Sequence, residues 1–434
     1  MQKADEKAER QPKNPRKPRS RQRFERKRER ILDAATDLIN ERGIKGTTLL
    51  DVATAVDLNT TSVTYYFRRK ELLAEAVFER TLGRLEGMVK EAAKAGTPQQ
   101  RVAQFIGANV DLREQVIRGT GLPLAKLSDV RTLDQESRKP LLEHYQSIFR
   151  QLRDYFGPAR NDLHKALLTA RTHMLLEVVF WLPIWISGYS ISDFPRVKSR
   201  LIDLLANGLG KPDARWEPNL IDMADEKNDP GLSEGQESFL RVATRLINDS
   251  GYRGASVVKI AEELNVTKGS FYHHLDAKDD LVMECFRRSY QRYSRVLSLA
   301  ETSEPDGWQR ICSAIATLLN IQFYSSWPLL RTSAFQALPA SLRADMVAKS
   351  NRTALRFAGT LIDGMEDGSV RIFDPLIASQ LIIATVNTAY DVRRWASRLP
   401  RDVAIAFYAS SLIDGLFNER VLDRVNSEIQ PAAN

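Results

Sequence analysis

The sequence predicts an all-α protein built as two tandem units, each with a three-helix helix-turn-helix headpiece and a larger helical domain. The chain has 434 residues, enough for about two to four domains, and 43% of them are hydrophobic, as in globular proteins. Apolar residues recur at helical spacing along much of the chain. One segment also occurs twice at a constant offset, which is the strongest of these observations.

The N-terminal segment holds the entire excess of positive charge. Residues 1–30 contain thirteen Lys and Arg and five Asp and Glu, a net charge of +8 that equals the net charge of the whole chain. The prolines and the lack of apolar periodicity predict that residues 1–22 form a disordered basic arm. Such an arm can neutralise nucleic-acid phosphates or enter the minor groove of DNA. The alternative is a tail that only increases solubility.

An internal repeat relates residues 31–73 to residues 239–281 without a gap, at an offset of 208. Chance would give about two or three identities in such a window, whereas twelve are present, so the repeat indicates a structural unit. The identical pairs are Leu32/Leu240, Ala35/Ala243, Thr36/Thr244, Leu38/Leu246, Ile39/Ile247, Asn40/Asn248, Gly43/Gly251, Gly46/Gly254, Ala53/Ala261, Ser62/Ser270, Lys70/Lys278 and Leu73/Leu281.

A weaker repeat continues downstream, so the duplicated unit extends over about 200 residues. The further matches are Pro123-Leu124 with Pro328-Leu329 and Arg138 with Arg343, both at an offset of 205, and Trp185-Ile-Ser187 with Trp395-Ala-Ser397. Residues 211–234, between the copies, are net acidic and contain Pro and Gly, which predicts a flexible linker. The predicted domains are the arm at 1–22, the first headpiece at 23–85, the first helical body at 86–210, the linker at 211–234, the second headpiece at 235–290 and the second helical body at 291–428.

The first two helices of the headpiece follow from spacing and caps. Apolar residues within 31–39 lie on one helical face, and Gly43 is expected to end that helix because glycine readily adopts positive φ. Thr48 and Asp51 have the spacing of a capping box at the start of a short second helix. The second copy has Ser256 without the acidic partner, so its capping box is incomplete.

The third helix completes a helix-turn-helix. A short turn is expected around Asp57, a helix over about 60–66, and a long fourth helix from Lys70. In such a motif the final helix enters the major groove. A generic three-helix packing module is the alternative, but the exposed side chains of the third helix are hydroxyl, aromatic and hydrogen-bonding groups that suit phosphates and base edges. These side chains are Asn59, Thr60, Thr61, Thr64, Tyr65 and Tyr66 in the first copy, and Thr267, Lys268, Gly269, Tyr272, His273 and His274 in the second.

These segments resemble the signature of the TetR/AcrR family of regulators. The likeness is close for residues 266–281 (VTKGSFYHHLDAKDDL) and looser for residues 58–73 (LNTTSVTYYFRRKELL). It implies an all-helical fold, a DNA-binding headpiece, and a helical domain that binds a small effector and dimerises. It further implies that Thr48 and Ser256 touch phosphate, and that Lys70 and Lys278 hold phosphate at the start of the fourth helix.

Both copies depart from the family pattern. In the first copy Thr61 replaces the usual Gly and Thr64 the usual first Tyr, which puts its particular contacts in doubt but not its fold. In the second copy His274 and Leu275 stand where the family often has Tyr and Phe. Adjacent His side chains on a helix point about 100° apart, and no Cys or acidic cluster joins them, so we expect no metal site.

The helical bodies contain aromatic residues with few charges among them in the sequence, which suggests an apolar or aromatic effector. The alternative is that these aromatics belong to the core or to a dimer seam. His173 and Glu177 lie one turn apart and could orient a polar group of the ligand. The candidate ligand-binding residues are His173, Glu177, Phe180, Trp181, Trp185, Trp327, Phe335, Tyr390 and Trp395.

Several function classes lack sequence support. The motifs of hydrolases, phosphate-binding loops and metalloproteases are missing, so we expect neither an enzyme nor a cofactor. The apolar stretch at 166–186 contains three ionisable residues and is expected to be a buried helix instead of a membrane span. Two cysteines, Cys285 and Cys312, and a charged N-terminus without a signal peptide favour a reduced bacterial cytoplasm, with nucleoid association when DNA is bound.

The function expected from the sequence is a sequence-specific transcriptional regulator, a repressor that a small effector releases from its double-stranded operator. The alternative is a helical scaffold that keeps the headpiece fold without binding DNA. Because the two third helices differ, pairing of the copies within one chain would predict dissimilar half-sites. A homodimer of the whole chain, with four headpieces, is the other possible assembly.

Overall fold

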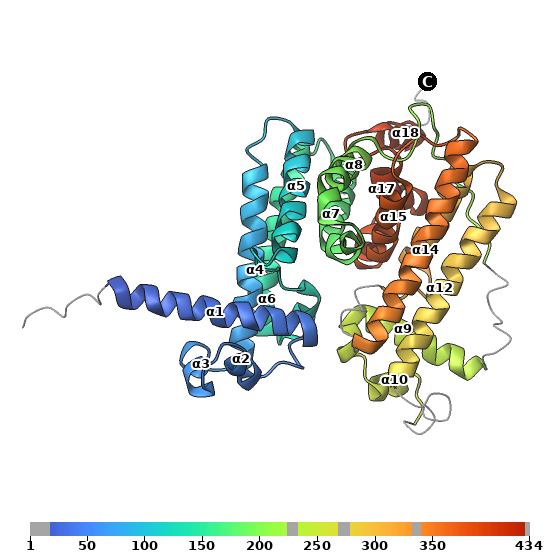
Figure 1. The fold of residues 1–434 in the computed structure, drawn as a ribbon. Coiled ribbons are helices and arrows are strands. Elements are labelled where there is room, and N and C mark those ends of the chain that lie inside the picture. Colours follow the sequence, from blue (N-terminus) through green and yellow to red (C-terminus); the bar gives the residue numbers. More distant parts are fainter. Residues whose placement is uncertain (1–17, 224–232, 268–277, 332–339, 430–434) are drawn as a thin grey trace, which may run out of the picture. The chain divides into compact units, whose positions relative to one another are not determined.

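The computed structural model describes residues 18–223, 233–267, 278–331 and 340–429, and every regular element within these ranges is a helix (Figure 1). The fold class expected from the sequence is therefore confirmed. Residues 1–77 form one compact unit and residues 78–434 form another. The helix α4 (Lys70–Ala92) runs from the first unit into the second.

The first unit contains the first headpiece. Its helices are α1 (Pro18–Arg42), α2 (Leu49–Ala55), α3 (Thr60–Tyr66) and the start of α4. Gly43 follows α1 with φ 69°, and its N–H donates to the carbonyl of Ile39 at 2.8 Å, as expected for a glycine C-cap. Residues 18–22, which the composition assigned to the disordered arm, are instead helical, because α1 continues past Phe24 and this side chain packs on α3.

The first helical body follows α4 in the chain. Its elements are α5 (Pro98–Ile117), η1 (Leu127–Thr132), α6 (Gln135–Arg153), η2 (Asp154–Phe156), α7 (Asp162–Trp185), η3 (Ile186–Gly188), η4 (Ile191–Asp193) and α8 (Phe194–Asn207). α7 is long and apolar enough to cross a membrane by length and composition, but 67% of its most apolar window is buried inside the protein. Its contacts with α15 and α17 identify it as a core helix.

The second headpiece and second body repeat this order. The elements are α9 (Glu234–Gly254), α10 (Val257–Glu263), α12 (Lys278–Ser303), α13 (Gly307–Tyr324), α14 (Ala340–Glu366), α15 (Pro375–Ala389), η7 (Tyr390–Val392), α16 (Arg393–Ala396), α17 (Arg401–Ile413) and α18 (Arg420–Ile429). α9 kinks at Gly251, which has φ 74° and occupies the position of Gly43 in the repeat.

The segment after α8 is not the free linker that its composition suggested. The Trp308 indole N–H donates to the carbonyl of Arg215 at 2.8 Å, and the Asn219 and Ile221 amides donate to side chains of α13 at 2.9 and 3.0 Å. These contacts hold residues 215–221 along the second body, because the extended backbone finds hydrogen-bond acceptors on α13. Any free linker is therefore shorter than the predicted residues 211–234.

Equivalent hydrogen bonds show that the repeat extends into the bodies. The Ala125 N–H donates to the Thr81 hydroxyl at 3.0 Å, and at the matching positions the Leu330 N–H donates to the Ser289 hydroxyl at 2.8 Å. Arg84 donates to the carbonyls of Leu122 at 2.8 Å and Pro123 at 3.1 Å, and its equivalent, Arg292, donates to the carbonyl of Trp327. The offsets of 208 on α4 and α12, and of 205 beyond them, therefore describe three-dimensional equivalence.

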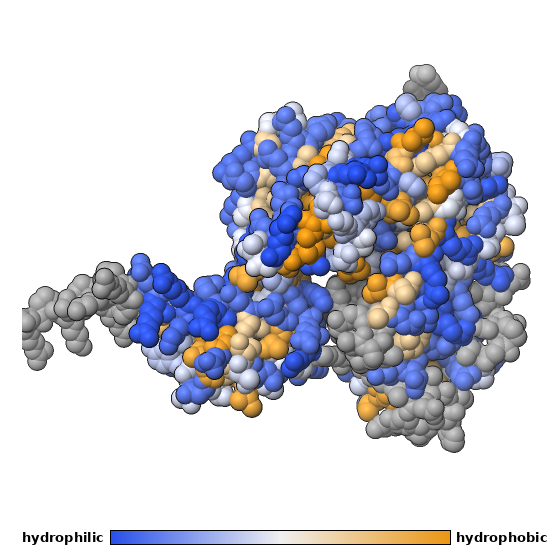
Figure 2. Space-filling model, in the orientation of Figure 1, coloured by the Kyte–Doolittle hydropathy of each residue, from blue (hydrophilic) through white to orange (hydrophobic). Residues whose placement is uncertain are grey.

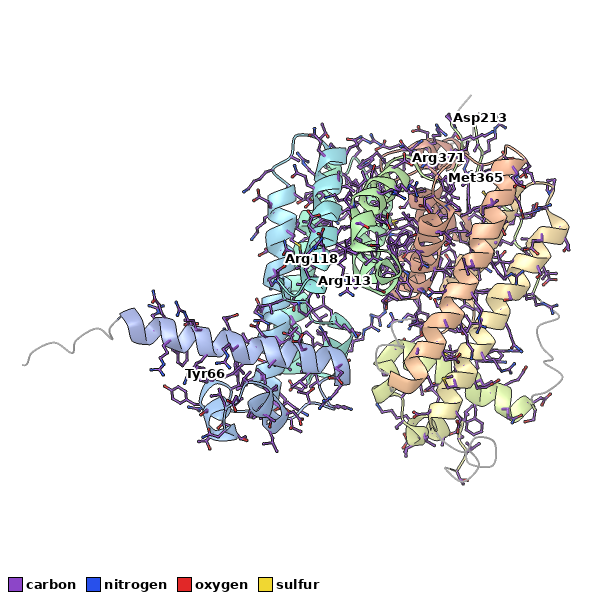
Figure 3. The ribbon with its side chains drawn as sticks, in the orientation of Figure 1. Tyr66, Arg113, Arg118, Asp213, Met365 and Arg371 are labelled. Carbon is purple, nitrogen blue, oxygen red and sulfur yellow. The ribbon has the colours of Figure 1, made fainter. Side chains whose placement is uncertain are left out.

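The two bodies meet through their last helices. α7 and α8 of the first body both pack against α15 and α17 of the second, which forms a four-helix seam (Figure 1). The backbones also join at one end of the seam, where Leu209 N–H donates to Leu412 O and Leu416 N–H donates to Leu205 O, both at 2.8 Å. Arg371, labelled in Figure 3, adds a hydrogen bond to the carbonyl of Gly208 at 2.7 Å.

Candidate DNA interface and effector-binding bodies

In the third helix of the first headpiece, three of the predicted side chains, Asn59, Thr61 and Tyr65, are exposed, and Asn59 is used as the helix cap. The Asn59 side chain caps α3 by accepting from the Ser62 N–H at 2.7 Å. Val63 is completely buried and anchors the opposite face. Thr61 is exposed, and Tyr65 is 72% exposed, the least buried aromatic side chain in the described part of the headpiece. These two side chains are therefore available to a groove.

The remaining members of this face are partly engaged within the protein. Thr60 and Thr64 are half-buried, and the Thr64 hydroxyl donates to the carbonyl of Thr60 at 3.1 Å. Tyr66, labelled in Figure 3, packs on Phe24 of α1 with ring centroids 4.6 Å apart. Partial burial raises the pKa of Tyr66. The main contact of the Tyr66 ring is thus its packing on α1, a role that periodicity within α3 did not predict.

Phe24 also places a basic helical segment beside α3. Its ring lies 6.1 Å from that of Tyr65, edge to face, so three aromatic side chains from α1 and α3 form one cluster. Arg21, Arg23 and Arg26 flank Phe24 in α1 and are exposed. The surface at this end of α1 is strongly hydrophilic (Figure 2). Sequence reasoning missed Phe24 because it stood alone within a charged segment.

The second helix of the first headpiece begins at the predicted capping box. The Asp51 N–H donates to the Thr48 hydroxyl at 3.1 Å, and the Thr48 N–H donates to the Asp51 carboxylate at 2.8 Å. Hydrogen bonds from Thr48 lower the pKa of Asp51. Thr48 is exposed at the helix N-terminus, a position where helix dipoles favour anions. Lys70 is half-buried at the start of α4.

Both headpieces contain the same tight turn. Asp57 has φ 56° and its equivalent, Asn265, has φ 53°, a conformation that Asp and Asn tolerate better than most residues. The following N–H closes the turn in each copy, from Leu58 to the Ala53 carbonyl at 2.9 Å and from Val266 to the Ala261 carbonyl at 3.0 Å. This shared geometry is what a helix-turn-helix requires between its last two helices.

The described part of the second headpiece agrees with its sequence. Ser256 caps α10 by accepting from the Lys259 N–H at 3.2 Å, without a reciprocal bond from the Lys259 side chain, as its sequence indicated. Ser256 and Thr267 are half-buried and exposed, respectively. The predicted residues Lys268, Gly269, Tyr272, His273 and His274, and the side chain of Lys278, lie outside the described residues.

Comparison with known proteins identifies the two headpieces. Residues 31–77 and 239–285 each match the family model for bacterial regulatory proteins of the tetR family. The chain belongs to the TetR family. It carries two tandem units, as the internal repeat predicted.

The similar proteins each match only part of this chain. One relative, the uncharacterised HTH-type transcriptional regulator in the dhlA 5′ region of Xanthobacter autotrophicus, is 27% identical over 173 residues, which cover 38% of this chain and 79% of that protein. The HTH-type transcriptional regulator BetI of Burkholderia mallei is 34% identical over 87 residues, 20% of this chain and 45% of BetI. Among solved structures, AibR in complex with isovaleryl coenzyme A and operator DNA aligns with a TM-score of 0.35 and 19% identity, over 41% of this chain and 96% of AibR.

In this TetR-family chain the second headpiece is attached to both bodies through the end of α9. The Asn248 side chain accepts from the Arg331 N–H at 3.0 Å and donates to the Leu329 carbonyl at 2.9 Å. Arg131, from η1 of the first body, donates to the Asn248 carbonyl at 3.1 Å and to the Asp391 carboxylate at 2.9 Å. Asp391 also forms an ion pair with Arg331. We call these four residues (Arg131, Asn248, Arg331 and Asp391) the junction network.

Contacts of the next residue of α9, Asp249, strengthen this attachment. Asp249 accepts from the Tyr390 hydroxyl at 2.9 Å and from the Arg393 guanidinium at 2.7 Å. Arg393 also stacks over the Tyr390 ring at 3.9 Å. The second headpiece is therefore held by Arg131 of the first body and by several residues of the second body, an arrangement that reasoning from a single unit does not predict.

His173 and Glu177, predicted to orient a ligand, lie next to the junction network. Both are half-buried on α7, and Tyr145 of α6 is half-buried within electrostatic reach of Glu177. Burial, with a contribution from nearby Asp391, raises the pKa of Glu177 to about 8, and burial lowers the pKa of His173 to about 4. The His173 Nδ1 lies 3.2 Å from the Tyr408 hydroxyl across the seam. Tyr145, His173 and Glu177 therefore form one polar cluster of the first body, at the seam.

The predicted aromatic residues do not gather into one apolar pocket. Trp181 donates to Gln380 at 3.2 Å in the seam, and Trp185 is buried. Trp327 lies under three guanidinium groups at 5.2–5.8 Å, and Tyr390 belongs to the attachment of α9. Trp395 packs on a core cluster to which both bodies contribute, Phe180 is half-buried on α7, and Phe335 lies outside the described residues. The expectation of few charges around these rings was wrong for Trp327 and Tyr390. Arginines distant in sequence lie over Trp327, and Arg331 and the nearby Arg393 lie over Tyr390.

Proposed function

We propose that this TetR-family regulator reads an asymmetric operator with two unlike headpieces paired within one chain. The observation that carries the proposal is the seam formed by α7, α8, α15 and α17. The repeat makes α7 equivalent to α15 and α8 equivalent to α17, so the seam joins equivalent helix pairs, as a dimer interface does in a symmetric dimer. The pairing surface of each half is therefore already occupied by the other half.

The two headpieces then present different chemistry to the two half-sites. Thr61 and Tyr65 in the first correspond to Gly269 and His273 in the second. Side chains of the third helix contact base edges in the major groove, so unlike helices select unlike sequences. The basic end of α1 adds phosphate contacts on the side of the first headpiece only, since α9 begins with acidic residues.

Footprinting with light scattering tests this proposal. The expected result is one chain of 49.2 kDa per operator and a protected site without twofold symmetry. Tyr65→Ala is expected to weaken protection in one half of the site, and Ser256→Ala in the other. A palindromic site bound by two chains would contradict the intramolecular pairing. The absence of any salt-sensitive, sequence-specific complex would favour the scaffold alternative.

We further infer that the protein is a repressor whose operator affinity falls when a small effector binds in the helical bodies. The support is the position of the cluster of Tyr145, His173 and Glu177, which lies beside the junction network that holds α9. A ligand that favours a different arrangement of this cluster would shift the second headpiece, because coupling requires differential contacts in the two states. Reporter expression from the chain's own promoter region should rise when the protein is removed.

A further inference from the structure

The second body contains a small, mainly apolar cavity whose lining includes several polar side chains and no charged one. Residues of α12, α14 and α15 and the segment before α14 form its walls, and none of them carries a charged side chain. In this conformation it has room for about one water molecule. The lining residues are Phe286, Ser289, Tyr290, Tyr293, Leu330, Ser350, Thr353, Ile383 and Asn387.

Three polar groups in this lining have no partner among the described residues. They are the amide nitrogen and the amide oxygen of Asn387 and the hydroxyl of Tyr293. Both residues are only 4% exposed, so bulk water does not satisfy these groups. A buried polar group without a hydrogen bond destabilises the folded state, because it has lost its bonds to water. An occupant of the cavity that supplied one donor and one acceptor would remove most of this cost.

We propose that this cavity is a binding site for a small neutral molecule with both a hydrogen-bond donor and an acceptor, such as a primary amide or an alcohol. Asn387 would pair with the donor and the acceptor, and the Tyr293 hydroxyl would add a third hydrogen bond. A charged ligand is disfavoured because no lining side chain could compensate its desolvation. The inference rests on the proposed function, since it names the chemistry of an effector for one body.

Tyr290 is half-buried, whereas the other residues that line the cavity are buried. Its hydroxyl donates to the carbonyl of Met346 at 3.1 Å, which ties α12 to α14. A ligand larger than water would need to displace this ring. Movement of Tyr290 therefore links occupancy of the cavity to the spacing of α12 and α14.

The equivalent positions in the first body carry different chemistry. The offsets established by the repeat pair Ser350 with Tyr145, and on the seam helices they pair Ile383 with His173 and Asn387 with Glu177. The side chains at the site in the second body are thus neutral, whereas the equivalent positions in the first body include an acid and an imidazole. We therefore expect the two bodies to select ligands of different charge.

Thermal unfolding of the full chain with three probes of similar size tests the site: acetamide, acetate and ethylammonium. Acetamide is expected to raise the unfolding midpoint, and this rise should be about 1–2 °C larger in the wild type than in Asn387→Leu or Tyr293→Phe. Comparing each variant with the wild type at the same probe concentration removes general solvent effects. Glu177→Gln serves as the matched control, because it changes the equivalent position and should leave the acetamide response intact.

The variants also have an expected result without a probe. Asn387→Leu should unfold at the same temperature as the wild type or higher, because it removes two unsatisfied groups at similar volume. An equal response to acetamide in the wild type and both variants, or a response to acetate or ethylammonium that is lost in Asn387→Leu, would overturn the proposal. A mobility-shift assay on the same variants separates this failure from a failure of DNA binding, because the thermal measurement involves no DNA.

Discussion

Replacing Arg131 by Leu should loosen the second headpiece although Arg131 belongs to the first body. The substitution removes two hydrogen bonds, one to the Asn248 carbonyl at 3.1 Å and one to the Asp391 carboxylate at 2.9 Å. Asp391 keeps its ion pair with Arg331, so no carboxylate is left unpaired. Leu preserves the apolar stem of the side chain, so packing losses remain small.

The magnitude follows from the exposure of the groups. Hydrogen bonds to charged groups contribute about 1.5–3 kcal/mol when buried. The Arg131 side chain is 37% exposed, so solvent screening reduces the combined effect to about 1–2 kcal/mol. Local opening of the end of α9 should therefore become about 5–30 times more frequent.

Hydrogen exchange measured by mass spectrometry checks this expectation. Peptides that cover the last turns of α9 should exchange about 5–30 times faster in Arg131→Leu, while peptides from α5 keep their rates. Arg118→Leu is the matched control, because it removes an exposed ion pair with Glu114, at 2.8 Å, that touches neither headpiece. Unchanged exchange in α9, or an equal change in Arg118→Leu, would refute a link through Arg131.

Three further predictions concern the caps, the aromatic cluster and a buried acid. Thr48→Ala should destabilise the first headpiece by about 1 kcal/mol and Ser256→Ala should destabilise the second by less, because only Thr48 has a reciprocal capping partner; exchange rates in α2 and α10 measure both. Phe24→Ala should speed exchange in residues 21–27 and lower DNA affinity, whereas Tyr66→Phe should do neither, because packing needs the ring and not the hydroxyl. Glu177 has an ordinary pKa of 4.5, raised to about 8 in the folded protein, so the native state binds its proton more tightly. Its contribution to stability is present below about pH 4.5 and is lost as pH rises to about 8; Glu177→Gln should flatten the fall in unfolding temperature over this window, and an unchanged slope would contradict the assignment.

The sequence by itself determined the all-α class, the duplication and much of each headpiece. Gly43, the Thr48–Asp51 box, the turn at Asp57 and the span of α3 all act through neighbours a few residues away. Such interactions depend on short-range geometry, so the spacing of the residues can be recognised in the sequence itself. The repeat added long-range information, because equal offsets imply equal structure, as the Thr81 and Ser289 hydrogen bonds demonstrate.

Only the tertiary structure decided which distant residues meet. Phe24 looked like an isolated apolar residue in a basic arm, and its packing on Tyr66 depends on how α1 and α3 cross. Arg131 and Asp391 are separated by 260 positions, and no local pattern marks them as partners. No local sequence pattern predicted the three guanidinium groups that lie over the Trp327 ring. Burial and pairing are properties of the folded surroundings, so helical periodicity can place a side chain on a face but cannot name what covers that face.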